Sequence, residues 1–317
     1  MWDLKIIEKL VTDKNSRLHT DEQAFLLFFI NKLNIQLAKN FRNIYINSNH
    51  PFIEAFRQNC KAVIGIDEAT DFRLIDLLCM STFNHPDFDS VTLSGDMMQK
   101  LTKDGLNSWK DYLLFNKKTE IHNLEISYRQ SQTLLSLAQD IYRGVNKTDA
   151  VYRSFIDKSE FEPLPLLFVS PDQHEKIKWM VDRILEIHES YSFIPSIAVF
   201  VPDENQLEKF ANDMGSFDEL SDVGIQVKAC RDGEVLGDKN TIRIFSIDKI
   251  KGLEFDTVFF HNADEILKAG VSTEMFYKFM YVGLSRASFY LGMTLNEKLP
   301  TEIEFIAENF STNQNWK

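Results

Sequence analysis

Short apolar runs rich in β-branched residues alternate with helical segments in the second half of the chain, and this alternation constrains the fold most. Strands that alternate with helices form a mostly parallel sheet with helices on both faces. The predicted strands span residues 164–170, 196–201, 225–230, 241–247, 256–263 and 289–295. The predicted helices among them span residues 174–190, 204–214 and 273–287.

The N-terminal part of the chain has the same α/β character but fewer strands. The apolar runs at 62–66 and 90–95 are predicted strands, and residues 42–47 are expected to form a third, short one. The spacing of apolar residues predicts helices over 4–11 and 20–41. Further helical patterns cover residues 50–59, 72–83 and 132–145. The first sheet therefore looks incomplete.

A length of 317 residues suggests about two domains. We expect two α/β domains with parallel sheets, covering residues 1–125 and 126–317. The net charge of −12 gives no general attraction to nucleic acid, although basic residues can still gather on one face. The sequence has no run long enough to cross a membrane and no signal-peptide pattern, so we expect a cytoplasmic protein without membrane contacts.

Two polar turns follow the predicted strands of the first domain. Asp67 and Glu68 come directly after residues 62–66, and ligands in open α/β sheets bind at the carboxyl ends of strands. An Asp in this place can hold Mg²⁺ through water, and a neighbouring Glu can activate an attacking water. Gln99, shortly after residues 90–95, can hydrogen-bond a phosphate without adding charge. Taken singly, either segment is equally compatible with an ordinary polar turn.

Three segments of the second domain carry side chains suited to phosphate. Arg129 stands just before a helix, Glu254 follows Gly252 ahead of a very apolar strand, and Arg286 ends an apolar helix. A lone Arg is usually a solvated surface residue. An Arg on the buried side of a helix, however, needs an anionic partner.

In their order and spacing, five segments resemble motifs II to VI of UvrD/Rep/PcrA-type helicases of superfamily 1. The segments are "IDEATD", "LSGDMMQ", "SYRQ", "KGLEFD" and "YVGLSRA", and the resemblance covers roughly residues 60–295. It implies two RecA-like domains that hydrolyse ATP in the cleft between them. It also implies translocation along single-stranded DNA with 3′→5′ polarity, and ATP with Mg²⁺ as the ligands.

The resemblance also implies a role for each matching residue. Asp67 would hold Mg²⁺, Glu68 would activate the hydrolytic water, and Gln99 would sense the γ-phosphate. Arg129 and Arg286 would reach the γ-phosphate as arginine fingers.

Three further residues would meet the nucleotide itself. These are Glu254, Gly252, which allows close backbone approach, and Tyr128. Aromatic residues that could stack on DNA bases are Tyr128, Phe245, His261 and Tyr277. For each of these four, packing in the core is the favoured interpretation.

The family's phosphate loop, G-x-x-x-x-G-K-[ST], does not occur in this sequence. Three explanations follow. The chain is a fragment or shortened version of a larger helicase, or a subunit whose loop comes from a second protein chain, or a non-catalytic helicase-like module that binds DNA or a protein partner. The retained carboxylates and arginines favour the first two, because an inactive module has little chemical reason to keep them.

Overall fold

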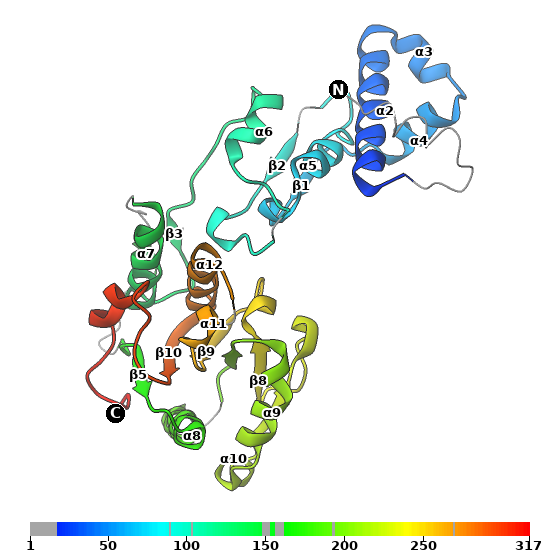
Figure 1. The fold of residues 1–317 in the computed structure, drawn as a ribbon. Helices are drawn as coiled ribbons and strands as arrows, with labels where there is room; N and C mark the ends of the chain where they lie inside the picture. The colour runs from blue at the N-terminus through cyan, green and yellow to red at the C-terminus, as the bar shows by residue number, and fades with distance from the viewer. Residues whose placement is uncertain are drawn as a thin grey trace. The chain divides into compact units, whose positions relative to one another are not determined.

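The computed structural model describes residues 18–88, 90–102, 104–147, 153–155, 162–191, 194–268 and 270–317. The chain divides into two compact units, unit 1 over Met1–Ile121 and unit 2 over His122–Lys317 (Figure 1). The sequence analysis placed the boundary between residues 125 and 126. The helix expected over residues 4–11 lies outside the described residues.

Unit 2 is built on a six-stranded sheet in which all neighbouring strands are parallel, in the order β5-β10-β9-β6-β8-β7. The strands are β5 (Leu166–Val169), β6 (Ile197–Val201), β7 (Gln226–Ala229), β8 (Thr241–Ser246), β9 (Phe255–Phe260) and β10 (Ala287–Leu295). Every residue of β6 is buried, as expected for an inner strand covered on both faces. The predicted α/β class with a parallel sheet is confirmed.

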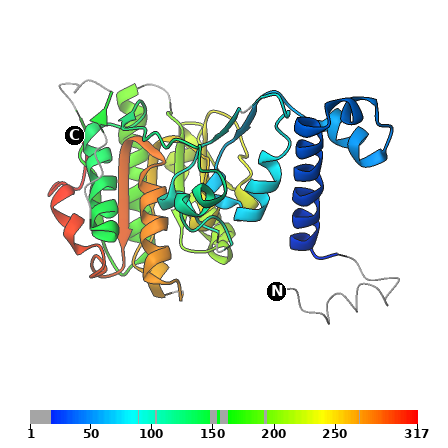
Figure 2. The same ribbon diagram turned by 90° about the horizontal axis from the view of Figure 1, so that it is seen from above.

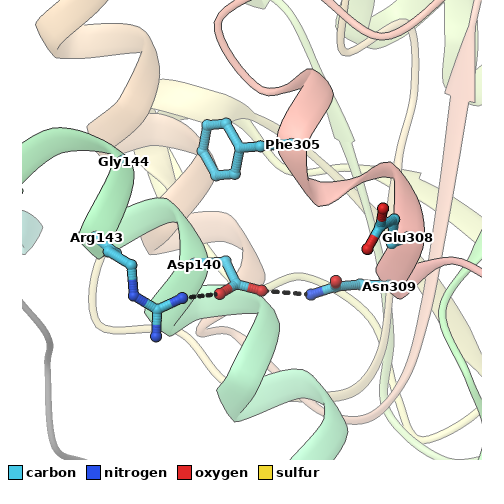
Figure 3. Close-up of a pocket in the computed structure, with 6 residues that line it drawn as sticks. All are labelled: Asp140, Arg143, Gly144, Phe305, Glu308 and Asn309. Atoms are coloured by element: carbon cyan, nitrogen blue, oxygen red, sulfur yellow. Dashed lines mark hydrogen bonds and ion pairs between the residues drawn. The ribbon is translucent and has the colours of Figure 1, made fainter.

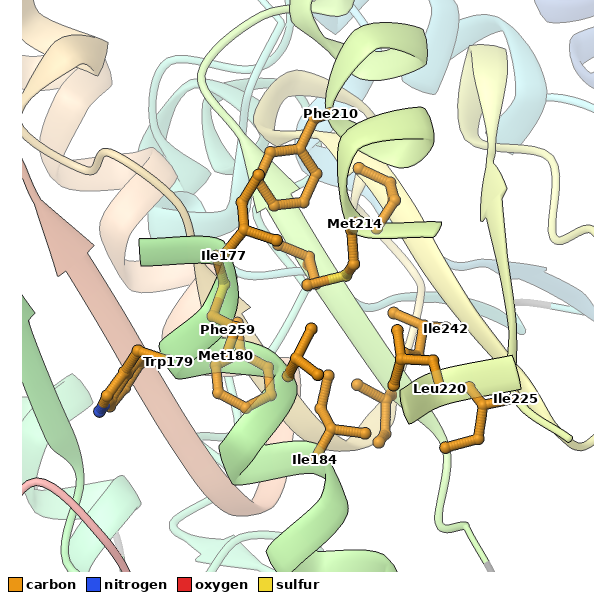
Figure 4. Packing of buried hydrophobic residues seen from close by; sticks show 14 of the residues in the cluster. Ile177, Trp179, Met180, Ile184, Phe210, Met214, Leu220, Ile225, Ile242 and Phe259 are labelled. Atoms are coloured by element: carbon orange, nitrogen blue, oxygen red, sulfur yellow. The ribbon is translucent and has the colours of Figure 1, made fainter. Parts of the chain in front are cut away.

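Helices cover both faces of this sheet (Figure 1, Figure 2). Helices α8 (Gln173–Tyr191) and α9 (Glu204–Gly215) pack on one face. Their buried side chains contact every second residue of the strands on that face (Figure 4). On the other face lie α7 (Gln132–Asn146) and α12 (Thr273–Leu284). Shorter helices are α10 (Asp218–Asp222), α11 (Glu265–Lys268), η3 (Arg231–Gly233), η4 (Ile247–Lys249) and η5 (Glu304–Asn309).

A glycine in α12 lets this helix approach the sheet closely. A Cβ atom at Gly283 would stand 2.3 Å from the ring of Phe260 in β9, closer than real side chains come. The absence of a side chain therefore sets the depth at which α12 packs, and with it the position of the residues that follow the helix.

Unit 1 contains a sheet of two short parallel strands, β1 (Ile64–Ile66) and β2 (Val91–Leu93). Its helices are α2 (Thr20–Asn40), α3 (Arg42–Asn47), α4 (Pro51–Asn59), α5 (Leu74–Ser81), α6 (Trp109–Phe115), η1 (Ala69–Asp71) and η2 (Met97–Gln99). Ile66, Leu77 and Leu106 lie at the centre of its core. Within the described residues this sheet has two strands, against six in the main sheet of unit 2.

The strand predicted over residues 42–47 is wrong, because this segment forms helix α3. Its apolar alternation does not mark a buried face, since Ile44 and Ile46 are exposed while Tyr45 is buried. Arg57 donates to the carbonyl oxygens of Tyr45, Ile46 and Ser48, which a helix end leaves without partners. This tertiary contact outweighs the β propensity of the segment.

Unit 2 contains a second small sheet that no sequence pattern predicted. Strands β3 (Ile126–Ser127) and β4 (Arg153–Ser154) pair in parallel, with Ile126 opposite Arg153. Strands of two residues have no periodicity, so no sequence pattern could reveal them. Among the helices of the described residues, none is long and apolar enough to span a membrane.

A network of buried, hydrogen-bonded polar side chains lies at the carboxyl ends of β9 and β10. Lys176 of α8 donates from Nζ to Asn262 Oδ1 at 2.6 Å and to Asn296 Oδ1 at 2.5 Å. His261 is buried beside it, with Nδ1 3.1 Å from Thr294 Oγ1 and Nε2 3.0 Å from Gln173 Oε1. Burial, helped by the Lys176 ammonium, lowers the pKa of His261 to about 3.

This depressed pKa predicts a loss of stability in mild acid. At pH values between about 3 and 6.5 the unfolded chain binds a proton at His261 that the folded chain does not, so stability falls as the pH falls. Between pH 7 and pH 5 the loss from this residue is about 2 kcal/mol. Urea unfolding followed by tryptophan fluorescence at both pH values measures it. His261→Gln should remove this part of the pH dependence, whereas His50→Gln, at an exposed position, should retain it. Equal pH dependence in His261→Gln and the unaltered chain would contradict the prediction.

Candidate active site

Asp67 lies at the carboxyl end of β1, on a loop held by the next strand. The Ser94 hydroxyl and the Glu68 backbone N–H both donate to Asp67 Oδ1, at 2.7 and 2.9 Å. In turn, Ser94 N–H donates to Ile66 and Ser94 O accepts from Ala69 N–H. The exposed carboxylate of Asp67 is therefore fixed in direction by the loop that follows β2.

Glu68 has a left-handed backbone conformation, with φ 51° and ψ 37°. A residue other than glycine rarely adopts it, and it costs on the order of 1 kcal/mol or more. Glu68 leads from β1 directly into η1 (Ala69–Asp71). Such strain is typical of sites where the position of a side chain matters.

Gln99 belongs to the loop after β2 and connects to the loop after β1 through Asp96. Gln99 Nε2 donates to Asp96 Oδ2 at 3.3 Å, and Thr70 Oγ1 donates to Asp96 O at 3.3 Å. A Cβ at Gly95 would stand 3.2 Å from the backbone nitrogens of residues 69 and 70. Glycine thus permits the two loops to adjoin, and unit 1 places Asp67, Glu68 and Gln99 on them.

The oxygen atoms at this edge suit Mg²⁺, which prefers carboxylate, hydroxyl and water oxygens. In the parts of the chain that the structure describes, no group of three or more His, Cys, Asp or Glu residues could hold a metal ion. One carboxylate, completed by water and by phosphate oxygens, is the usual way in which proteins bind Mg²⁺. Asp67 fits this pattern.

Arg129 and Glu254 form an ion pair in unit 2. The distance from Arg129 Nη2 to Glu254 Oε1 is 2.7 Å, and the two side chains are 40% and 54% exposed. Solvent screens a pair at this exposure, so it contributes about 1 kcal/mol or less to stability. The guanidinium can therefore change partners at little cost.

Arg286 lies immediately after α12 and is 4% exposed. Its guanidinium donates from Nη1 to Leu253 O and from Nε to Val282 O, both at 3.1 Å, and from Nη2 to Ser285 Oγ at 2.9 Å. The sequence analysis expected an anionic partner for this Arg. The hydrogen bonds above go to two carbonyls and a hydroxyl, and they tie the end of α12 to the loop before β9.

The structure brings together the residues predicted from three separate segments of unit 2. Arg129 reaches Glu254, and Arg286 reaches Leu253, so both arginines meet the loop that leads into β9. Gly252 in this loop has φ +77°, which glycine adopts without strain, and the space where its Cβ would lie is open. This site lies at the amino ends of β9 and β10, whereas Asp67 lies at the carboxyl end of β1.

Gln130 is a positioning residue that the sequence analysis missed. Its buried side-chain amide donates to Leu284 O and Ala287 O, both at 3.1 Å. The neighbouring Ser131 N–H donates to Ser288 O. Gln130 therefore attaches the Arg129 segment to the end of α12. Its place inside "SYRQ" was the signal that could have revealed it.

The four aromatic candidates for DNA contact have different environments. Phe245 and His261 are fully buried, which confirms the core interpretation for them. Tyr277 is partly buried and its hydroxyl donates to Glu302 O at 3.0 Å. Tyr128 is 69% exposed, so the core interpretation is wrong for this residue.

A cavity of about 400 Å³ lies beside α7 and η5 in unit 2 (Figure 3). In this cavity, Asp140 Oδ1 forms an ion pair with Arg143 Nη1 at 2.7 Å, and Asp140 Oδ2 accepts a hydrogen bond from Asn309 Nδ2 at 2.8 Å. The cavity is lined by Asp140, Arg143, Gly144, Phe305, Glu308 and Asn309. Because this lining includes none of the residues predicted for phosphate chemistry, the cavity is separate from the candidate site.

No protein-family model matches the chain, and no curated protein matches it. Many solved structures align with it, among them the following two. The C-terminal domain of a possible DNA helicase from Lactobacillus plantarum WCFS1 shares 20% identity with a TM-score of 0.41, over 60% of this chain and 97% of that one. An arterivirus helicase, nonstructural protein 10 in complex with DNA, shares 14% identity with a TM-score of 0.37, over 74% of this chain and 40% of that one. At these TM-scores the likenesses carry no argument about function.

Proposed function

We propose that this chain is a nucleotide-hydrolysing part of a UvrD-like helicase of superfamily 1, which moves 3′→5′ along single-stranded DNA. The main support for this proposal is that Arg129 pairs with Glu254 while Arg286 donates to Leu253 O, so both arginines contact the same loop. These residues come from three segments that resemble consecutive helicase motifs, and nothing in their sequence separation requires them to meet.

In unit 1 the proposed chemistry rests on Asp67, Glu68 and Gln99. Glu68 accepts a proton from the water that attacks the γ-phosphate of ATP, as a general base. Asp67 would hold Mg²⁺ through its exposed carboxylate, and the ion would neutralise phosphate charge. Gln99 offers an amide to the water or phosphate without adding charge.

In unit 2 the proposed chemistry rests on positive charge and an approachable backbone. Arg129 exchanges Glu254 for a phosphate, at a cost no larger than that of a screened ion pair. Arg286 stabilises the developing charge of the transferred phosphoryl group. The open space at Gly252 lets phosphate approach the main chain. Tyr128 presents an exposed ring to the base.

The missing phosphate loop must come from elsewhere for full activity. We propose that a further polypeptide segment supplies it, whether from a longer form of this protein or from a second chain. The competing function is a non-catalytic module that binds DNA or a protein, and the absence of the loop favours it.

Hydrolysis and binding of ATP by the 317-residue chain, with and without oligothymidylate, test the proposal. We expect Mg²⁺-dependent ATP binding by this chain and little or no hydrolysis, far below the roughly 1 s⁻¹ at the low end of ordinary enzymes, because the phosphate loop is missing. Chelation of Mg²⁺ by EDTA should weaken the binding. Hydrolysis that DNA stimulates would mean that another segment of the chain replaces the loop, whereas ATP binding without hydrolysis is the result expected of an incomplete motor. Failure to bind ATP at all would overturn a nucleotide site in this chain.

A further inference from the structure

Two aromatic rings stand side by side on the surface of unit 2. The ring centroids of Tyr128 and Phe155 are 4.9 Å apart and their planes are tilted by 42°. The two residues are 69% and 66% exposed. Phe155 belongs to none of the segments that resemble helicase motifs, so the sequence analysis gave no reason to notice it.

The backbone fixes the two rings as neighbours. They directly follow the paired strands β3 and β4, and Phe155 N–H donates to Ser127 O at 2.7 Å. Ser154 is held in turn, because its hydroxyl donates to Gln130 O at 2.7 Å and its N–H donates to Gln132 Oε1 at 3.2 Å. The Phe155 ring is thus attached to the segment that carries Arg129.

Core packing does not account for this ring pair. Paired aromatic side chains on neighbouring strands normally stabilise a sheet by burying apolar surface, but most of the surface of these two rings remains in water. Their tilt keeps them from stacking face to face on each other, so ring surface is left for a third planar group. A flat, weakly polar ring is the partner that such a surface fits best.

The charge beside the rings indicates what else this partner carries. Arg129 follows Tyr128 directly in the chain, and its guanidinium is half-exposed in an ion pair that is easily exchanged. An aromatic surface next to an available guanidinium matches a base linked to phosphate. We propose that Phe155, together with Tyr128, forms a stacking platform for the base of the bound nucleoside triphosphate.

The proposal rests on the proposed function and adds a residue to it. Phe155 has no polar atom, so it can contribute to affinity through the face of the base but cannot take part in phosphate chemistry. Stacking of a base on an aromatic side chain is worth about 1–3 kcal/mol. Loss of Phe155 is therefore expected to weaken nucleotide binding about 5- to 150-fold while the bound nucleotide reacts at an unchanged rate.

Calorimetric titration of the full chain with ATP, and with inorganic triphosphate, tests the platform. Triphosphate carries a similar charge but has no base. Phe155→Ala should weaken ATP binding by this factor and leave triphosphate binding unchanged. Phe155→Tyr should bind ATP normally, because it keeps a flat ring. Phe52→Ala, at an exposed Phe of α4, is the matched control and should change neither constant.

The remaining outcomes separate this proposal from the proposed function. If ATP binds Phe155→Ala as tightly as it binds the unaltered chain, the platform is wrong and the proposed function stands. If neither ATP nor triphosphate binds the unaltered chain, the proposed function fails and the platform fails with it. If Phe155→Ala weakens binding of oligothymidylate and not of ATP, the rings hold DNA bases and the proposal is overturned.

Discussion

Replacing Glu68 with Gln is expected to lower the rate of ATP hydrolysis by about 10²- to 10⁴-fold, the usual contribution of a general base. Gln has almost the shape of Glu but cannot accept the proton of the attacking water. The strained turn at Glu68 and the hydrogen bonds of Asp67 do not depend on the Glu68 carboxylate, so both should persist in the variant. Turnover at saturating ATP in a chain completed by a phosphate loop, with oligothymidylate present, measures the effect.

Two comparisons decide how the Glu68 result is interpreted. The dissociation constant of ATP should change little in Glu68→Gln, because the substitution removes a step of the reaction rather than a binding contact. Glu54→Gln, at an exposed position of α4, should hydrolyse ATP as the unaltered chain does. Equal turnover in Glu68→Gln and Glu54→Gln would remove Glu68 from the proposed mechanism.

Replacing Arg286 with Ala is expected to have two separate effects. In a chain completed by a phosphate loop, turnover should fall on the order of 10³-fold, as losses of arginine fingers do. The structure adds a second expectation, which needs no activity. The free energy of unfolding should fall by about 3 kcal/mol, because the partly buried Leu253 O loses a charged donor and so does Val282 O, which also accepts from the Ser285 hydroxyl.

Urea unfolding of the Arg286 variants measures the second effect directly. Arg286→Lys keeps the charge but cannot reach both carbonyls and the Ser285 hydroxyl at once, so its stability should be intermediate. Arg231→Ala removes an exposed Arg paired with Glu208 and should leave the stability unchanged. An Arg286→Ala chain as stable as the unaltered one would contradict the hydrogen bonding described for this residue. Near-normal turnover would remove Arg286 from the site.

Much of the fold could be predicted because it depends on local patterns. The inner strand β6 of the six-stranded sheet is apolar along its whole length, as a parallel strand covered on both faces should be, and each strand of this sheet was anticipated within a few residues. The same patterns misled at residues 42–47, where Arg57 from a later helix decides the structure. These patterns gave no signal at β3 and β4, because two residues are too few to show a periodicity of apolar side chains.

Burial was harder to predict than secondary structure. Helix α2 was expected from its spacing of apolar residues, yet it buries Asn31 and Asn34 while Phe29 and Leu33 remain exposed. Asn31 Nδ2 donates to Thr82 Oγ1 at 2.9 Å, so a partner far along the chain makes its burial favourable. Tyr128 is exposed although core packing was expected for it, because its surroundings depend on segments far apart in the chain.

The sequence by itself determined the alternation of strands and helices, the carboxylates after β1 and the order of five helicase-like segments. These features depend on residue type and short spacing, which the chain carries locally. Only the tertiary structure decided that Arg129 and Arg286 meet the loop before β9, that Gln130 holds this arrangement, and that Phe155 stands beside Tyr128. Such contacts join residues far apart in the chain, and the packing of whole helices and strands sets them.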